Sequence, residues 1–525
     1  MTSTQRWTLV AAIIGSGAVF LDGTVVNLAL KTIGQELPAS FVGVLEGQTY
    51  LVSGYLAVLA ALLILGGALS DHYGRRRVFA IGLAGFAVTS ALCGLAPTME
   101  WLILFRLAQG AAGALLVPGS LALISGCFEG AARGRAFGIW AAATSALTLA
   151  GPIVSGLLVD TIGWRFAFLV NVPVLGFALW VTLRHVRETR DPSAARRFDW
   201  LGAAVAALAV GGLSAGLIRG QEQAWADPLA WGLIVVGVIA LIAFPILMAT
   251  RPDPLVPLSL FKSRAFTTIN LATFFIYGAL YVQFAYQALV LQATLGYTAL
   301  GAGAVGIPFG ALLAVLSTRI GTLAGLYGSR RFLVMGPLLV AGAMAWYARL
   351  PVDSEPWMLR LDDPSTWIPP LDVLVDVLPA VLLGGLGMSL VVAPLTNTLM
   401  GSVPERSAGL GSAINNSISR VGQPLLGAII FVAVSATFYA TLGTLQPDLD
   451  TTSAEVRQQF QPLNPPQDVT PEQATAATQA SMDAFHLAML VAAALLVVGA
   501  VISYVGLRAD RPARSTELAA AEPST

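Results

Sequence analysis

Long apolar runs recur along the whole chain, and they limit the possible fold more than any other feature of the sequence. Each run has roughly 18 or more residues, enough for a helix to cross about 30 Å of hydrocarbon. Only α-helices and closed β-barrels satisfy their backbone hydrogen bonds in lipid, and these runs are far too long for barrel strands. The sequence therefore predicts an all-α polytopic membrane protein.

The composition supports the same prediction. Of the 525 residues, 56% are hydrophobic and 11% are charged, and the mean hydropathy is +0.75. Soluble globular chains carry about 25% charged residues, so this chain has too few to cover a surface in water. The net charge is zero, which gives no general attraction to nucleic acid. Cys93 and Cys127 lie in apolar runs and are interpreted as core residues, and we expect no metal and no cofactor.

Fourteen apolar segments are long enough to be membrane spans. The first is interpreted as a retained helix, because it is longer than the apolar part of a signal peptide and further spans follow it. Two outer loops, 351–372 and 443–483, are long. The predicted spans are 7–30, 44–69, 78–96, 101–125, 136–159, 164–183, 200–218, 229–249, 266–291, 299–323, 332–348, 373–400, 408–442 and 484–507.

The basic residues predict the orientation of these spans. An even number of spans places both ends of the chain on one side of the membrane, and Lys and Arg concentrate in cytoplasmic loops. With the ends inside, the inner segments carry 21 of the 29 Lys and Arg residues and the outer segments carry five. The remaining three, Arg106, Arg165 and Arg420, fall within spans. We therefore expect both termini in the cytoplasm.

The chain also contains an internal repeat. Residues 67–77 read GALSDHYGRRR and residues 321–331 read GTLAGLYGSRR, at an offset of 254 residues (321 − 67 = 254). Spans one to six then match spans nine to fourteen, and spans seven and eight are an insertion. Two parallel six-helix halves are typical of transporters, although a duplicated receptor or membrane enzyme could show the same symmetry.

The repeat predicts the division of the chain. We expect fourteen transmembrane helices in two pseudo-symmetric six-helix bundles, with two inserted helices between them. The predicted parts are an N-terminal bundle at 1–184, inserted helices with flanking cytoplasmic loops at 185–264, a C-terminal bundle at 265–507, and a disordered cytoplasmic tail at 508–525.

Several motifs resemble one family. Residues 67–77 follow the pattern G-x-x-x-D-x-x-G-x-R-R, and here the sequence resembles the major facilitator superfamily, in particular its fourteen-span drug:proton antiporters. Residues 21–29, 106–110, 151–156 and 163–173 also resemble motifs of that group. The resemblance implies a monomer in a bacterial inner (plasma) membrane that exports hydrophobic or cationic small molecules, such as drugs, in exchange for protons by alternating access. Its partners would be a small hydrophobic substrate, protons and membrane lipids.

Asp22 and Arg106 are the candidate residues for proton coupling, because ionisable side chains inside spans are costly and usually functional. Asp22 lies 15 residues after Trp7, about 22 Å along a helix, and Arg106 lies five residues after Trp101, about 8 Å from the opposite side. The two depths agree, and in the family these spans face the central cavity. The alternative is a fixed ion pair that only holds helices together; the next candidate acids would be Asp376 and Glu46.

The loop after the second span is a candidate conformational latch. In the family this loop holds the two halves together, with its acid near a helix N-terminus, where the helix dipole favours negative charge. The alternative is a solvated turn. The predicted latch residues are Gly67, Asp71, Gly74, Arg75, Arg76, Glu129 and Arg133. The resemblance also places an antiporter motif at Gly151, Pro152 and Gly156, where the proline bends the helix.

The ninth span carries aromatic residues at helical spacing, so that Phe274, Tyr277, Tyr281 and Phe284 share one face. Such a face suits a large apolar ligand, and packing or lipid contact is the alternative. Polar residues in other spans either line the same cavity or hold helices together. The candidate cavity residues are Asn27, Gln109, Phe274, Tyr277, Tyr281, Phe284, Gln287, Asn397, Asn415, Asn416 and Arg420.

Two other functions remain open at this stage. Within transport, the cargo could be a native lipid or a metabolite made by the cell. A membrane enzyme or receptor belongs to a different class, but the sequence carries no nucleophile motif and no Walker loop for ATP. We therefore predict a transporter and not an enzyme.

Overall fold

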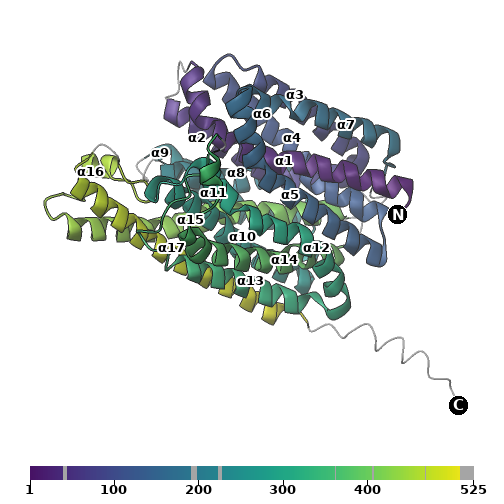
Figure 1. Cartoon of the computed structure of the whole chain (residues 1–525). Coiled ribbons are helices and arrows are strands. Elements are labelled where there is room, and N and C mark those ends of the chain that lie inside the picture. The colour runs from purple at the N-terminus through teal and green to yellow at the C-terminus, as the bar shows by residue number, and fades with distance from the viewer. Residues whose placement is uncertain are drawn as a thin grey trace.

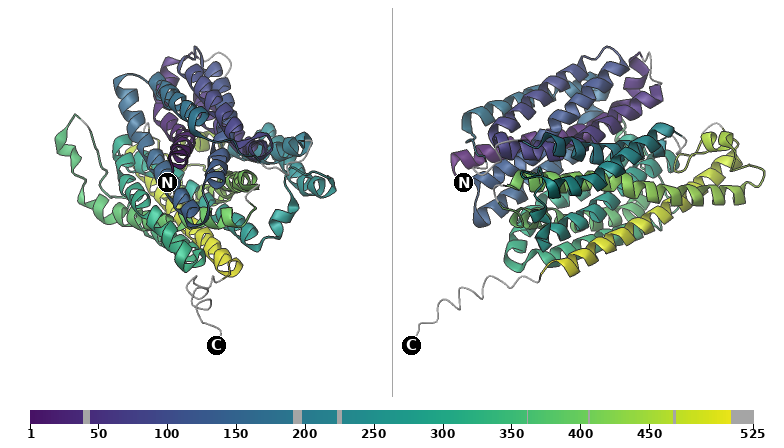
Figure 2. Two further views of the ribbon diagram at one scale, coloured as in Figure 1. Left: turned by 90° about the vertical axis from the view of Figure 1, so that its right-hand side faces the viewer. Right: turned by 180° about the vertical axis from the view of Figure 1, so that it is seen from behind.

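The computed structural model describes residues 1–38, 44–190, 198–222, 227–360, 362–404, 407–466 and 469–508. These residues form helices and no strand; Gln461 and Asn464 make an isolated β-bridge. The long helices lie side by side, and α1 begins at the end of the bundle where α17 ends (Figures 1 and 2). We call this the terminus end, and the opposite end, which carries α16, the loop end.

The helices before the predicted insertion form one set. Capping supports several starts: Thr2 caps the first helix and Thr98 the fourth, each accepting a backbone N–H with its hydroxyl. These helices are α1 (Ser3–Glu36), α2 (Val44–Tyr73), α3 (Arg75–Gly94), α4 (Met99–Cys127), α5 (Gly130–Thr161), α6 (Arg165–Leu169) and α7 (Asn171–His185).

The second set follows the inserted pair α8 (Trp200–Glu222) and α9 (Pro228–Thr250). A short 3-10 helix, η1 (Leu258–Lys262), leads into it. Its helices are α10 (Arg264–Leu289), η2 (Val290–Thr294), α11 (Ala299–Val305), α12 (Ile307–Tyr327), α13 (Ser329–Tyr347), η3 (Pro364–Trp367), η4 (Val373–Val377), α14 (Leu378–Gly401), α15 (Ala408–Leu445), α16 (Ala454–Gln459) and α17 (Pro471–Gly506).

Twelve helices in the described part of the chain are long and apolar enough to cross a membrane. Each of the fourteen predicted ranges overlaps a helix, but the ranges 136–159 and 332–348 fall on α5 and α13, which are not among those twelve. An all-α membrane fold is therefore confirmed, whereas the predicted number of fourteen spans is not.

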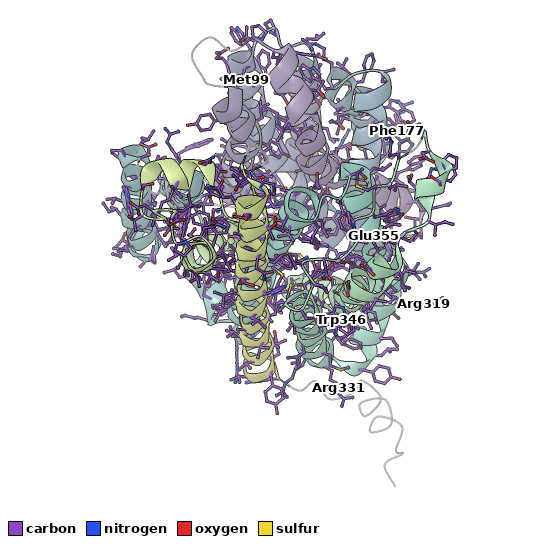
Figure 3. The ribbon with its side chains drawn as sticks, turned by 60° about the vertical axis from the view of Figure 1, so that its left-hand side comes forward. Met99, Phe177, Arg319, Arg331, Trp346 and Glu355 are labelled. Carbon is purple, nitrogen blue, oxygen red and sulfur yellow. The ribbon has the colours of Figure 1, made fainter. Side chains whose placement is uncertain are left out.

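The two sets pack against each other along two seams, α2 with α15 and α5 with α12. Figure 2 shows them as two layers, with the first set in purple to blue and the second in green to yellow. In Figure 3, Met99 and Phe177 lie on the first set, and Trp346 and Arg331 lie on the second. Any site shared by both halves therefore lies between these layers.

The inserted helices α8 and α9 pack closely on each other. A Cβ at Gly212 would lie 3.0 Å from the Leu233 carbonyl oxygen, and a Cβ at Gly216 would lie 2.9 Å from the Ala230 carbonyl oxygen. Small residues let membrane helices approach in this way. At their connection Asp227 accepts from the Leu229 N–H and from Arg219, and these contacts hold the pKa of its carboxyl below the usual value.

The predicted outer loop at 443–483 is shorter than expected. Helix α15 has 38 residues and α17 has 36, so each is more than 50 Å long at about 1.5 Å per residue, well beyond a hydrocarbon core of about 30 Å. Helix α17 begins at Pro471, 13 residues before the predicted start of the last span at residue 484 (484 − 471 = 13), and Thr470 and Gln473 form a capping box there.

Candidate functional site

Asp22 of α1 and Arg106 of α4 form an ion pair in the interior of the first set. Each side chain is 1% exposed. Helices α2 and α4 come close enough to enclose the pair because Gly110 has no side chain: a Cβ there would lie 2.7 Å from the Tyr55 carbonyl oxygen. The structure thus brings together Asp22 and Arg106, which the sequence predicted to lie at the same depth in the membrane.

Both members of the pair have further hydrogen-bond partners. Asp22 Oδ1 accepts from Gln109 Nε2 at 3.1 Å and from Asn171 Nδ2 at 3.5 Å. Arg106 donates to Gln109 Oε1 at 2.8 Å and to the Leu51 carbonyl at 3.1 Å. Buried charges need such partners to offset their lost hydration. Gln109, expected in the substrate cavity, is therefore part of this buried network.

The sequence analysis did not select Asn171, Ser90 or Tyr55 as site residues. Asn171 donates to Ser90 Oγ at 3.2 Å, and the Tyr55 ring centre lies 4.0 Å from the Arg106 guanidinium carbon. Asn171 lies in the motif at 163–173, so the motif could have pointed to it. Ser90 and Tyr55 gave no such signal.

Asp71 connects the two sets of helices at the terminus end. Its Oδ1 forms an ion pair with Arg75 at 3.1 Å, and its Oδ2 accepts from the Leu410 N–H of α15 at 3.0 Å. Leu410 is in the first turn of α15, where free N–H groups and the helix dipole favour an anion. Gly67, one helical turn before Asp71, lies against Gly409 and Ala413 of α15.

The rest of the predicted latch has different partners. Gly74 has φ +112°, a value that favours glycine. After it, the N–H groups of Arg76 and Arg77 donate to the Glu188 carboxylate at 3.0 and 3.1 Å, a contact that sequence analysis missed. The Arg76 guanidinium also donates to the Leu183 carbonyl.

Glu129 and Arg133 were expected to extend the latch network. Glu129 is exposed and precedes the first residue of α5. Arg133 donates from Nε to the Phe128 carbonyl at 2.8 Å. Gly151 of the predicted antiporter motif is buried in α5. Pro152, Gly156 and the cavity candidate Asn27 lie in α5 and α1 but outside the residues whose side chains the structure describes.

The four aromatic residues of α10 that were predicted to share one face have three different sets of neighbours. Tyr277 and Tyr281 have ring centres 6.0 Å apart, and the Tyr281 ring centre lies 5.6 Å from the Arg420 guanidinium carbon. Phe284 lies further along α10, 5.5 Å from Phe309 of α12. Phe274 packs edge-on against its neighbour Phe275, at 5.2 Å.

A small cavity of about 50 Å³ lies inside the second set, between α10, α12, α13 and α14. Phe284 and Gln287 line it, together with Gln283 and Tyr347. Gln287 donates to the Tyr347 hydroxyl at 2.8 Å and accepts from Gln283. This volume suits a few water molecules and is too small for a drug-sized ligand.

Some polar residues of α14 and α15 contact other helices, whereas others form hydrogen bonds only within their own helix. Asn415 donates to Asn270 Oδ1 at 3.1 Å and to Thr273 Oγ1 at 2.9 Å, joining α15 to α10. Asn416 donates only within α15, to Ser412. Asn397 of α14 faces Gly134 of α5, where a Cβ would lie 3.5 Å from its Nδ2.

The described residues contain no cluster of three His, Cys, Asp or Glu side chains able to hold a metal ion. Cys93 is buried and Cys127 is partly buried, and both are free thiols. Among the described residues, the buried charged side chains are those of Asp22, Arg106, Asp71 and Arg75, and Arg420 is partly buried.

Comparison with known proteins identifies the family. Residues 12–427 match the Major Facilitator Superfamily. The chain is 33% identical over 449 residues to the puromycin resistance protein pur8 of Streptomyces alboniger, covering 83% of this chain and 84% of that one. It is 31% identical over 446 residues to the tetracenomycin C resistance and export protein of Streptomyces glaucescens, covering 84% and 77%.

Solved structures share the fold. The human organic anion transporter MFSD10 has a TM-score of 0.59 at 15% identity, covering 94% of this chain and 100% of that one. The proton:xylose symporter XylE has a TM-score of 0.56 at 14% identity, covering 95% of each chain. These apolar helices and this match over most of the sequence make the chain a multi-pass membrane protein that belongs to the Major Facilitator Superfamily.

Proposed function

We propose that this protein exports drug-like small molecules in exchange for protons by alternating access. The observation that carries the proposal is the buried Asp22–Arg106 pair with its hydrogen-bond network. A carboxylate held in a membrane interior is costly and can bind a proton, which gives it a functional use. The relatives named for puromycin resistance and for tetracenomycin C export support this cargo class.

The proposed architecture has fourteen spans, α5 and α13 included. The first half comprises residues 1–184, the insertion residues 185–264 and the second half residues 265–507. The terminus end is proposed to face the cytoplasm of a bacterial cell, because the basic residues concentrate there. The tail from 509, within the part at 508–525, lies outside the described residues. We propose that the protein works as a monomer and catalyses no covalent reaction.

In this proposal the structure corresponds to a state closed on the cytoplasmic side. Three contacts between the halves lie at that end: Asp71 with Leu410, Ser125 with Met400 at 3.9 Å, and Asn397 with Gly134. Opening this end requires the Asp71–Leu410 hydrogen bond to break. Asp71 would thus hold the closed state, which is the role expected of the latch.

The test is transport in reconstituted vesicles with an imposed pH gradient. We expect Asp22→Asn to abolish gradient-driven efflux of puromycin and of ethidium, because the amide cannot carry a proton. Asn171→Ala, which removes one neutral partner of Asp22, should retain partial efflux and controls for general damage to the site. Full proton-driven efflux by Asp22→Asn would contradict the proposal and leave the ion pair a structural role.

A further inference from the structure

Arg420 is a cationic residue deep in the membrane region. It lies 12 residues after Ala408, the first residue of α15 (420 − 408 = 12), or about 18 Å along the helix. Its guanidinium carbon lies 5.9 Å from the ring centre of Phe20 in α1 and 5.6 Å from that of Tyr281 in α10. Because these rings belong to different halves, the guanidinium lies between the halves and not against lipid.

The charge of Arg420 is not balanced by an acid in the described part of the chain. Arg106 pairs with Asp22 and Arg75 pairs with Asp71, whereas none of the ion pairs among described residues includes Arg420. A guanidinium stays protonated in proteins. An unpaired charge at this depth is costly, so its counter-charge is expected to come from a ligand.

A second hydrogen-bond donor lies beside the same aromatic ring. Trp140 of α5 is 7% exposed, and its Nε1 has no hydrogen-bond acceptor among the described residues. Its ring packs edge-on to Phe20 with centres 6.4 Å apart. Arg420 and Trp140 therefore both lie beside Phe20, and among the described residues the guanidinium has no acid partner and the indole N–H has no acceptor. Native proteins rarely leave a buried donor unpaired without a functional reason.

We propose that Arg420 and Trp140 bind the anionic group of an aromatic cargo, with Phe20 and Tyr281 contacting its ring. A carboxylate or phenolate would accept from the guanidinium and from the indole N–H, and charge-assisted hydrogen bonds of this kind are strong. Offset or edge-on packing of the two rings would hold the apolar part. The inference rests on the proposed export function and adds aromatic anions to the cargo of that function.

The pairing of the charged side chains inside the protein supports an anionic cargo group. The buried acids Asp22 and Asp71 are each paired with an arginine in this state, so neither carboxylate is free to bind a cationic group of the cargo. An anionic cargo would supply the counter-charge that Arg420 lacks among the described residues.

Binding of three probes with one ring system tests the proposal: naphthoate, naphthalenemethanol and naphthalenemethylamine. Affinity is measured by fluorescence on purified protein in phosphatidylcholine nanodiscs, without a proton gradient. Wild type should prefer the carboxylate. Arg420→Gln should weaken naphthoate binding roughly 10- to 100-fold and leave the alcohol unchanged, as expected for losing a charged hydrogen bond. Arg420→Lys should retain most of the affinity, which also shows that the site remains folded.

Two further variants separate the site from general effects of charge. Trp140→Phe keeps the ring and removes the N–H, and should weaken naphthoate binding roughly 3- to 10-fold. Arg349→Gln is the matched control, since this exposed guanidinium stacks 3.5 Å from the Trp346 ring centre away from the site, and it should change nothing.

Three results would overturn the inference. They are equal binding of the three probes by wild type, an unchanged naphthoate affinity in Arg420→Gln, and loss of the carboxylate preference in phosphatidylglycerol nanodiscs. The last result would assign Arg420 to a lipid headgroup. Because binding is measured without a gradient, proton-driven puromycin efflux reports on the export function separately: it would persist if only the inference fails.

Discussion

Protonation of Asp22 would change several contacts at once, because one carboxylate accepts from Arg106, Gln109 and Asn171. Neutralising it weakens these hydrogen bonds and leaves the Arg106 guanidinium buried without a counter-charge, which is strongly unfavourable. The Leu51 carbonyl and the Tyr55 ring would remain as partners of Arg106. On the proposed function, this imbalance links proton binding to movement of α1 relative to α4.

Asn415 allows a test of how much the hydrogen bonds of a polar side chain between two helices stabilise the fold. Asn415→Ala removes two hydrogen bonds to α10 and should lower the free energy of unfolding by about 1 kcal/mol, at about 0.6 kcal/mol for each such bond in a membrane protein. Thermal unfolding in detergent measures the change. Asn416→Ala is the control, since its amide bonds only within α15. Equal effects of both variants would contradict the role assigned to Asn415.

The sequence predicts functional residues where a side chain is energetically costly to place inside a membrane. Asp22 and Arg106 stood out because charges in spans are rare, and their matching depths suggested a pair. Asn171 and Ser90 complete the same network, but neutral polar residues are tolerated at many positions in helices. Their contribution depends on how α3 and α7 pack, which no single-sequence pattern reports.

Helices α2 and α15 meet closely at the terminus end. A Cβ at Gly67 would lie 2.4 Å from Ala413 Cβ and 2.6 Å from the Gly409 carbonyl oxygen, so a larger residue forces these helices apart. Gly325 occupies the position of Asp71 in the second repeat, and a Cβ there meets nothing within 4 Å. The two repeats therefore share a motif but not a contact.

Gly67→Ala should destabilise the state that is closed at the terminus end. Ser125 is 1% exposed and contacts Met400 across the halves, so Ser125→Cys reports opening there through its rate of thiol modification. Cys93 and Cys127 are first replaced by alanine. We expect modification to be several times faster with Gly67→Ala, because the Cβ meets backbone atoms that cannot move aside. Gly325→Ala should leave the rate unchanged, and faster modification in that variant would contradict the steric argument.

The type of each element was predictable, whereas several boundaries were not. Apolar runs in lipid leave only helix as a solution, so the helices follow from composition. The start of α17 at Pro471 was missed, because residues 471–483 are polar and the run of apolar residues begins later. There the helix is fixed by its capping box and by packing of Ala476 and Ala477 in the core, and not by hydropathy.

At the scale of the molecule, the inserted pair is joined more firmly to the first half than to the second. Along α2, Phe198 packs on His72 at 5.5 Å, Gly211 lies against Ala61, and the Arg219 guanidinium lies 5.6 Å from the Tyr50 ring centre. These contacts cover α8 from one end to the other. Its contact with α15 is an apolar cluster of Leu213, Leu217 and Ala428.

This difference predicts that α8 and α9 move with the first half and slide on α15 during transport. In a protein without Cys93 and Cys127, a short bis-methanethiosulfonate reagent should cross-link Gly211→Cys to Ala61→Cys and leave puromycin efflux near the uncross-linked rate. Cross-linking Leu217→Cys to Ala428→Cys should reduce efflux at least tenfold, because that link joins elements that must move relative to each other. A reducing agent should restore it, which excludes damage by the substitutions themselves. Efflux that survives the second link would mean that α15 moves with α8, and loss of efflux with the first link would mean that the inserted pair moves apart from α2.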